Sequence, residues 1–196
     1  MEFTDPRKLP FANVRSRGEL PHLYKAGGVY FVTFRLADAV VYRGSRIESE
    51  LREAAIMAPV DAYDPPLTLG SCALRRPDVA EIVQRALLAG NGSRYELAAW
   101  CVMPNHVHAV FQPLVDPKPS SILQSWKGGT ARRINPLLGR TGSLWERESF
   151  DHLIRNEDGV RKFVNYCNDN PVVAGLCGRA EDWPFSSIGV GYKFRV

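Results

Sequence analysis

Two histidines separated by a single valine stand in the stretch MPNHVHAVF, residues 103–111. Side chains alternate across a β-strand, so His106 and His108 would share one face while Val107 points to the other. Both imidazoles would then present a nitrogen to one point, as the ligands of a metal ion do. The alternative is a pair of histidines on the solvent-facing side of a strand, and the pair alone leaves both interpretations open.

A second group of polar residues lies in the stretch EDGVRKFVNYCND, residues 157–169, where apolar residues recur at helical spacing. Tyr166 and Asn170 are four residues apart, so they lie one above the other beside this apolar stripe. A tyrosine hydroxyl and an amide oxygen placed there could both reach a site on the sheet. In the alternative, Tyr166 is an ordinary half-buried aromatic residue and Asn170 caps the helix before Pro171.

These four residues together define a chemistry. Two imidazoles and an amide oxygen can hold Mg²⁺ or Mn²⁺ and leave coordination positions for phosphate oxygens. The cation would polarise a phosphodiester, and the tyrosine would attack phosphorus to give a covalent phosphotyrosine. That link retains the energy of the phosphodiester, so the strand can be rejoined elsewhere. No general base stands out in the sequence.

The elements that must position these residues alternate along the chain. Strands are predicted over residues 29–38, 95–103, 106–114 and 143–154, helices over residues 45–57, 79–89, 120–138 and 157–169, and a proline-rich loop over residues 58–70. Only two residues separate the second and third strands, which brings them together as a hairpin or a bent pair. We therefore expect an α+β fold, a ferredoxin-like βαββαβ antiparallel sheet with helices on one face and an appended C-terminal helix that carries Tyr166.

Local signals predict where these helices begin and end. Asp78 should cap the second helix and Asn156 the last, which Pro171 should stop. Gly128 and Gly129 should weaken the third helix.

The composition is that of a globular protein. Of 196 residues, 45% are hydrophobic and 23% are charged, which excludes a disordered chain. No apolar run approaches the roughly 20 residues that span a bilayer, and the first residues lack the apolar core of a signal peptide. We therefore expect a cytoplasmic protein with no membrane partner. The cysteines show no zinc-like spacing and are expected to be buried apolar residues: Cys72, Cys101, Cys167 and Cys177.

Several separated motifs resemble the REP-associated tyrosine transposases, which belong to the single-tyrosine HUH transposases. Along the chain, the motifs are LPHLYKAGGVYFVTFRL, MPNHVH, GRTGSLWERESFDHLIRNED, YCNDNPVVAGL and EDWPFSS. They follow one another in the order expected of the family and cover most of the chain. The resemblance implies metal-dependent cleavage and rejoining of single-stranded DNA, often at a hairpin formed by palindromic repeats. It leaves both a monomer and a homodimer open.

The resemblance also assigns roles to residues. His106 and His108 become the metal pair, Asn170 the third ligand, and Tyr166 the nucleophile that takes the 5′ phosphate and leaves a free 3′ hydroxyl. Tyr192 is a rival nucleophile, but no helix is predicted to aim it. The resemblance divides the chain into a basic N-terminal arm (1–27), an HUH domain (28–188) and a C-terminal tail (189–196). The loop over residues 58–70 is longer than is usual in the family.

Basic residues are concentrated in a few places within a net charge of +4. Residues 118–140 hold five basic residues and no acidic one, which suits a polyanion but is also common on a solvated face. Lys127, Arg132 and Arg133 are the predicted DNA contacts. Trp126 and Trp145 would stack on unpaired bases or, in the alternative, belong to the core.

Two functions of other classes compete with the transposase. The first is a domesticated DNA-binding protein that no longer cleaves, although drift should then have eroded the unused ligands. The second is an RNA-binding module on the same fold, although its aromatic-rich signature is missing from the central strands.

Overall fold

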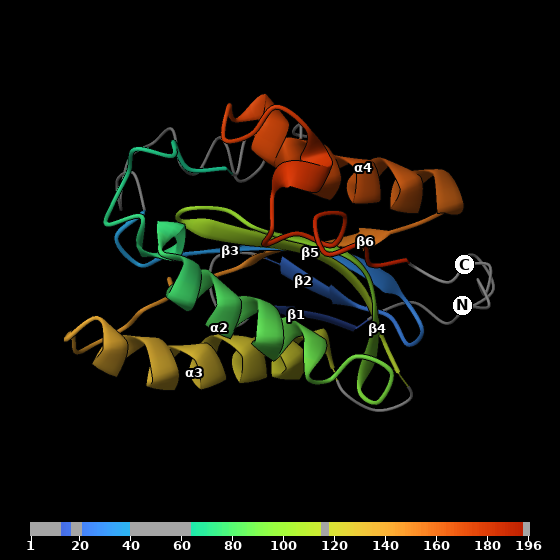
Figure 1. Cartoon of the computed structure of the whole chain (residues 1–196). Coiled ribbons are helices and arrows are strands. Elements are labelled where there is room, and N and C mark those ends of the chain that lie inside the picture. The colour runs from blue at the N-terminus through green and yellow to red at the C-terminus, as the bar shows by residue number, and fades with distance from the viewer. Residues whose placement is uncertain (1–12, 17–20, 40–63, 115–117, 194–196) are drawn as a thin grey trace, which may run out of the picture.

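The computed structural model describes residues 13–16, 21–39, 64–114 and 118–193, and a four-stranded antiparallel sheet lies at its centre (Figure 1). The sheet has the order β4-β5-β3-β6, with β3 (Val29–Arg35), β4 (Tyr95–Val102), β5 (His106–Pro113) and β6 (Phe150–Ile154). Three helices pack on it: α2 (Pro77–Leu88), α3 (Pro119–Leu137) and α4 (Glu157–Val173). The remaining elements within the described ranges are the strand pair β1 (Asn13–Ser16) and β2 (Pro21–Tyr24) and the short 3₁₀ helices η2 (Ala73–Arg75) and η3 (Ala180–Asp182).

The order of elements confirms the predicted ferredoxin-like fold. Strand β3, helix α2, the β4–β5 pair, helix α3 and strand β6 form the βαββαβ unit, and α4 follows it. Helices α2 and α3 cover one face of the sheet and α4 covers the opposite face, which gives three layers (Figure 1). The helix predicted over residues 45–57 lies outside the described residues. None of the described helices is both long and apolar enough to cross a bilayer.

Alternation along the central strands fills two cores. Val107 and Ala109 of β5 face α2 and α3, whereas Val110 faces α4. Strand β4 reverses its faces at an irregularity between Leu97 and Ala99. This bulge places an extra residue on the side of α4 and keeps both faces of β4 apolar.

Two predicted helix boundaries differ from the structure and a third is confirmed. Helix α2 begins at Pro77 with Arg76 as its N-cap, because proline suits the first helical position, and Asp78 instead forms an ion pair with Arg76. Helix α4 continues past Pro171 to Val173 and ends before Gly175, whose φ of +69° suits a helix end. The prediction that Asn156 caps α4 is confirmed, because its side chain accepts a hydrogen bond from the Gly159 amide at 2.8 Å.

Helix α3 has nearly the predicted extent, whereas the strand before α4 is shorter than predicted. Helix α3 runs unbroken through Gly128 and Gly129, since buried residues on both sides of the pair hold it against the sheet. The strand predicted over residues 143–154 is interrupted: Trp145 bridges Leu36, and β6 starts at Phe150.

Both tryptophans that were candidates for base stacking belong to the core. Trp126 and Trp145 are buried, and their indole N–H groups donate to the Tyr95 and Thr130 hydroxyls at 2.8 Å each. Their hydrogen bonds are therefore satisfied inside the protein. Of the four free cysteines, Cys101 and Cys167 are buried as expected, while Cys72 and Cys177 are half-buried.

Aromatic packing holds α4 on the sheet. Phe31 of β3 stacks on Phe163 of α4 with ring centroids 4.6 Å apart, and it meets the ring of Tyr166 edge-on at 5.8 Å. Both phenylalanines are buried. This contact fixes the rotation of α4 and therefore the direction in which Tyr166 points.

We expect Phe163→Ala to destabilise the protein by about 3 kcal/mol, because it removes a buried ring and leaves a cavity between α4 and β3. Urea unfolding of the metal-free protein measures this change. Val173→Ala in the same helix is the control, since Val173 is 85% exposed and its truncation should change the free energy of unfolding by less than about 0.5 kcal/mol. Equal losses in the two variants would contradict the packing described.

Candidate metal and nucleophile site

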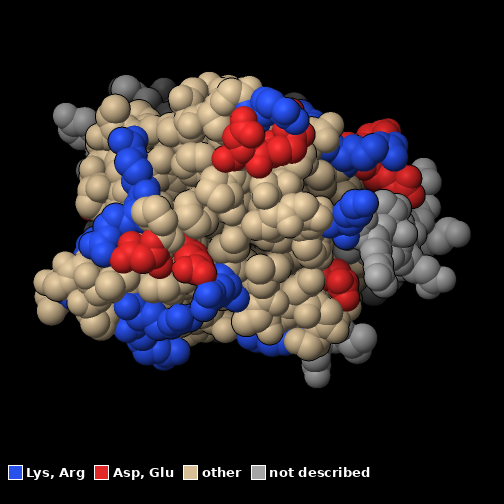
Figure 2. Space-filling model, viewed as in Figure 1, with Lys and Arg blue, Asp and Glu red and all other residues tan. Residues whose placement is uncertain are grey.

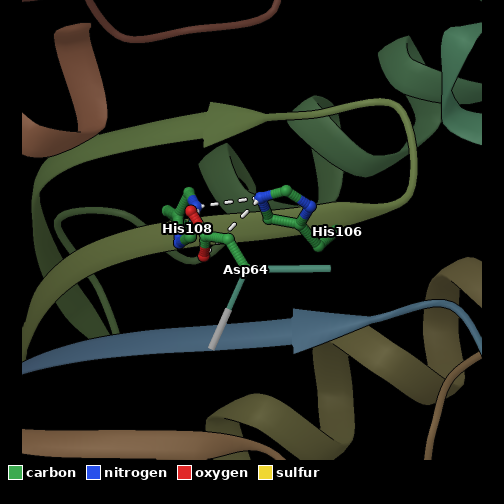
Figure 3. Close-up of side chains that lie close together, drawn as sticks. All are labelled: Asp64, His106 and His108. Carbon is green, nitrogen blue, oxygen red and sulfur yellow. Dashed lines mark hydrogen bonds and ion pairs between the residues drawn. The ribbon is translucent and has the colours of Figure 1, made fainter. Parts of the chain in front are cut away.

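The two histidines of β5 share the face of the sheet that α4 covers. Their side chains are buried, and their Nε2 atoms lie 3.0 Å apart (Figure 3). The predicted shared face is therefore present, and the alternative of a solvent-facing pair is wrong.

Hydrogen bonds on the far side of each ring orient the pair. The Nδ1 atom of His106 lies 2.8 Å from the side-chain oxygen of Asn105, whose amide nitrogen donates to the carbonyl oxygens of Pro66 and Leu69. That nitrogen is already used as a donor, so the Asn105 oxygen accepts a proton from Nδ1, and Nε2 of His106 carries a lone pair. The Nδ1 atom of His108 lies 2.8 Å from the Thr33 hydroxyl, which can donate or accept.

Asp64 is a site residue that the sequence analysis missed. It belongs to the loop before η2, and its Oδ1 lies 3.3 Å from Nε2 of His108 and 3.8 Å from Nε2 of His106 (Figure 3). Among the described residues, these three form a group whose ligand atoms all lie within 4.8 Å of one another. The proline-rich composition of the loop gave no sign that it carries a ligand.

Tyr166 and Asn170 reach the same place from α4. The Tyr166 hydroxyl donates a short hydrogen bond to Oδ2 of Asp64, and the Asn170 amide nitrogen donates to the same oxygen at 3.1 Å. The ring of Tyr166 meets the ring of His108 edge-on, with centroids 5.3 Å apart. The structure thus brings together all four residues that the sequence singled out and adds Asp64.

The rival tyrosine lies elsewhere, and a further histidine, His152, is not part of the metal-ligand group. The Tyr192 hydroxyl donates to the Leu97 carbonyl at 2.9 Å, and its ring packs on Trp100 in the core beneath α2 and α3. His152 is half-buried with its ring 5.1 Å from Phe163. Tyr192 is therefore a packing residue on the opposite side of the sheet from the histidine pair.

Burial and charge set the protonation of the site. Burial lowers the pKa of His106 to about 3, so this imidazole is neutral at physiological pH. Burial alone would raise the pKa of the Asp64 carboxyl, but His108, His106 and the hydrogen bond from Tyr166 outweigh it and hold that pKa well below its usual range. The site therefore combines a neutral imidazole with a carboxylate.

This arrangement fits a divalent cation. Two ligand atoms about 2.1 Å from an octahedral ion, in adjacent positions, lie about 3.0 Å apart, which matches the separation of the two Nε2 atoms. Oδ1 of Asp64 is buried and accepts no hydrogen bond from the described residues, as expected of a carboxylate oxygen that binds a cation. The outer hydrogen bonds of His106 with Asn105 and of His108 with Thr33 are of the kind that orients metal-binding histidines.

The predicted DNA contacts divide into two kinds. Lys127 is half-buried, and its ammonium donates to the Arg147 carbonyl at 3.0 Å, the Glu148 carbonyl at 3.4 Å and the Ser149 hydroxyl at 3.0 Å. Burial lowers its pKa to about 8. Lys127 therefore ties α3 to the segment before β6.

Arg132 and Arg133, by contrast, are exposed on α3 and have no ion pair among the described residues. Figure 2 shows Lys and Arg side chains gathered over the layer that α2 and α3 form. This surface lies across the sheet from the histidine pair.

Comparison with known proteins shows which family the chain is similar to. The model of the family described as "Transposase IS200 like" matches residues 76–167. This segment makes up just under half of the chain and is similar to the IS200-like transposases. The segment contains His106, His108 and Tyr166, whereas Asp64 and Asn170 lie outside it.

Curated relatives carry the name that the sequence motifs predicted, and the resemblance is confirmed. A putative REP-associated tyrosine transposase of Haemophilus influenzae is 28% identical over 112 residues, which cover 52% of this chain and 64% of that protein. The REP-associated tyrosine transposase of Escherichia coli is 32% identical over 95 residues, which cover 48% of this chain and 54% of that protein. The chain thus matches less than two thirds of the length of either relative.

A solved structure supports the fold. The structure of a REP-associated tyrosine transposase bound to a REP hairpin has a TM-score of 0.59 and 22% sequence identity. The match covers 88% of this chain and 84% of that one, so the two chains share a fold.

We expect acid to destabilise the metal-free protein through His106. Its folded pKa is about 3, below the unfolded value near 6.5, so the unfolded state binds more protons as the pH falls between these values. The contribution of neutral His106 to the free energy of unfolding is fully present above pH 6.5. Below that pH it decreases by up to about 1.4 kcal/mol per pH unit. Urea unfolding at pH 6.5 and 4.5 should show a smaller loss in His106→Gln than in the wild type. The control His152→Gln, with its half-buried ring, should keep most of the loss.

We expect Lys127→Met to cost about 1–3 kcal/mol of stability, because it leaves partly buried acceptors without their donor. Arg132→Met, on the exposed side of the same helix, should change stability by less than about 0.5 kcal/mol. Thermal and urea unfolding measure both. Equal stability of the two variants would contradict a structural role for Lys127 and would leave its ammonium available to contact DNA.

Proposed function

We propose that the chain is a metal-dependent single-stranded DNA transesterase that cleaves and rejoins DNA at hairpins formed by palindromic repeats. The observation that carries this proposal is the meeting of a phenol and two buried imidazoles at one carboxylate. A nucleophile beside a cation site is what a phosphoryl transfer through a covalent enzyme intermediate requires.

Tyr166 is the proposed nucleophile. Its hydroxyl oxygen attacks the phosphorus of the scissile phosphodiester, the bond from phosphorus to the 3′ oxygen breaks, and a 5′-phosphotyrosine and a free 3′ hydroxyl result. A second 3′ hydroxyl reverses the step and joins the strands. Because one phosphodiester replaces another, the exchange needs no external energy source.

His106, His108 and Asn170 are the proposed ligands of Mg²⁺ or Mn²⁺. The cation would polarise the phosphodiester and offset the charge that develops on its oxygens. Asn170 presents its amide nitrogen to Asp64, and a half-turn of the side-chain amide exchanges this nitrogen for the ligand oxygen. The neutral form of His106 suits this role, because only a neutral imidazole offers a lone pair.

Arg132 and Arg133 are the proposed contacts to DNA phosphates, and Lys127 contributes through the segment that it holds. Their exposure and the basic surface over α2 and α3 support this assignment. The names of the relatives, together with a solved neighbour bound to a REP hairpin, support a hairpin as the partner, bound by a monomer or a homodimer.

Incubation with a hairpin-bearing single strand and Mn²⁺ should give a covalent protein–DNA adduct on a denaturing gel. Tyr166→Phe should abolish it, since phenylalanine has no hydroxyl to attack phosphorus. Tyr192→Phe is the matched control and should keep the adduct within about twofold, because that hydroxyl bonds a core carbonyl. An adduct that persists in Tyr166→Phe would overturn the assignment.

Binding measured in parallel separates recognition from chemistry. Arg132→Ala combined with Arg133→Ala should weaken hairpin binding and flatten its salt dependence, because two phosphate contacts are lost. Wild-type binding without cleavage across several hairpin sequences would instead favour a DNA-binding protein that has lost its chemistry.

A further inference from the structure

The two oxygens of the Asp64 carboxylate face different partners. Oδ1 points toward the Nε2 atoms of His106 and His108. Oδ2 accepts hydrogen bonds from the Tyr166 hydroxyl and the Asn170 amide. One side chain therefore connects the cation site on the sheet with the tyrosine on α4.

Hydrogen bonds from a side chain and a close backbone approach hold the loop that carries Asp64 in place. The Asn105 side chain, next to His106 in the sequence, donates to the Pro66 and Leu69 carbonyls at 2.9 and 3.1 Å. Further along the loop, Gly70 has a φ of +76° and lies so close to Asp38 that a Cβ would come within 2.7 Å of its carbonyl oxygen. The same amide that orients His106 thus anchors the loop of Asp64.

Charge also favours a carboxylate at this point. A divalent cation held by neutral imidazoles and an amide alone keeps two positive charges. One carboxylate and one phosphodiester, each with a single negative charge, bring the sum to zero in a buried site where unpaired charge is costly. Oδ1 of Asp64 is buried without a hydrogen-bond donor among the described residues, so it is available for this role.

We propose that Asp64 is both a cation ligand and the positioning residue of the nucleophile. Oδ1 completes the cation site with His106 and His108, and Oδ2 holds the Tyr166 hydroxyl beside it. This inference rests on the proposed transesterase and deepens it, because cation binding and placement of the nucleophile then depend on one side chain.

The first measurement is the affinity of the metal-free full chain for Mn²⁺ alone, by isothermal titration calorimetry. Asp64→Asn and Asp64→Ala should weaken it at least about tenfold, because a charged ligand is lost. Tyr166→Phe should leave it within about threefold, since the phenol is not a ligand. Asp78→Asn is the matched control, because that exposed carboxylate pairs with Arg76 away from the site.

The second measurement is a double-mutant cycle on the melting temperature in the presence of a chelator. Asp64→Asn and Tyr166→Phe should be non-additive by about 2 °C or more, because both act on one hydrogen bond. Asp64→Asn and Tyr192→Phe should be additive, since those residues share no contact. The alanine variant at position 64 repeats the cycle with no polar atom left behind.

The outcomes separate this inference from the proposed function, because neither measurement uses DNA. Unchanged Mn²⁺ affinity in both Asp64 variants, or additivity with Tyr166→Phe, would overturn the role of Asp64 even if wild-type protein forms the adduct. Weakened Mn²⁺ binding with non-additivity would support it even if no adduct forms, and in that case only the transesterase proposal would fall.

Discussion

The site depends on one constraint: strand β5 buries two imidazoles side by side and fixes their Nε2 atoms 3.0 Å apart. The Asn105 oxygen keeps the proton of His106 on Nδ1, so the Nε2 atom of His106 carries a lone pair. A second lone pair at that distance would repel the first, and the rings therefore need a proton or a cation between them. Thr33 permits both states of His108, because its hydroxyl can donate or accept.

The place of Tyr166 follows from apolar packing more than from its own hydroxyl. Cys167, its neighbour in α4, is fully buried, and Phe163 stacks on Phe31 of the sheet. These contacts fix the rotation of the helix, which leaves Tyr166 half-buried at the edge of the stripe with its ring against His108. A hydroxyl at the boundary between core and site can reach Asp64 while the ring contributes to packing.

Periodic features could be predicted from the sequence, and non-local ones could not. Alternation along β5 predicted the shared face of the histidines, and the 3.6-residue period of α4 predicted the row of Tyr166 and Asn170. Asp64 belongs to a loop with no period, 42 residues before His106 in the sequence. Its place depends on hydrogen bonds between the Asn105 side chain and the loop backbone, which no local pattern encodes. The continuous α3 helix is a similar case, since burial of Trp126 and Thr130 on either side of the two glycines outweighs their low helix propensity.

Helix α3 also shows why charge composition alone does not identify DNA contacts. Lys127 and Arg132 belong to the same basic stretch, yet the ammonium of Lys127 is held by acceptors before β6 while Arg132 reaches solvent. The sheet separates this exposed surface from the α4 layer that holds Tyr166 (Figure 1). A DNA molecule that contacts both must pass around an edge of the sheet, and bending a duplex sharply is costly. For the proposed function, a hairpin joined to a flexible single strand would meet this geometry, because the stem would rest on the basic surface while the unpaired strand turned toward Tyr166.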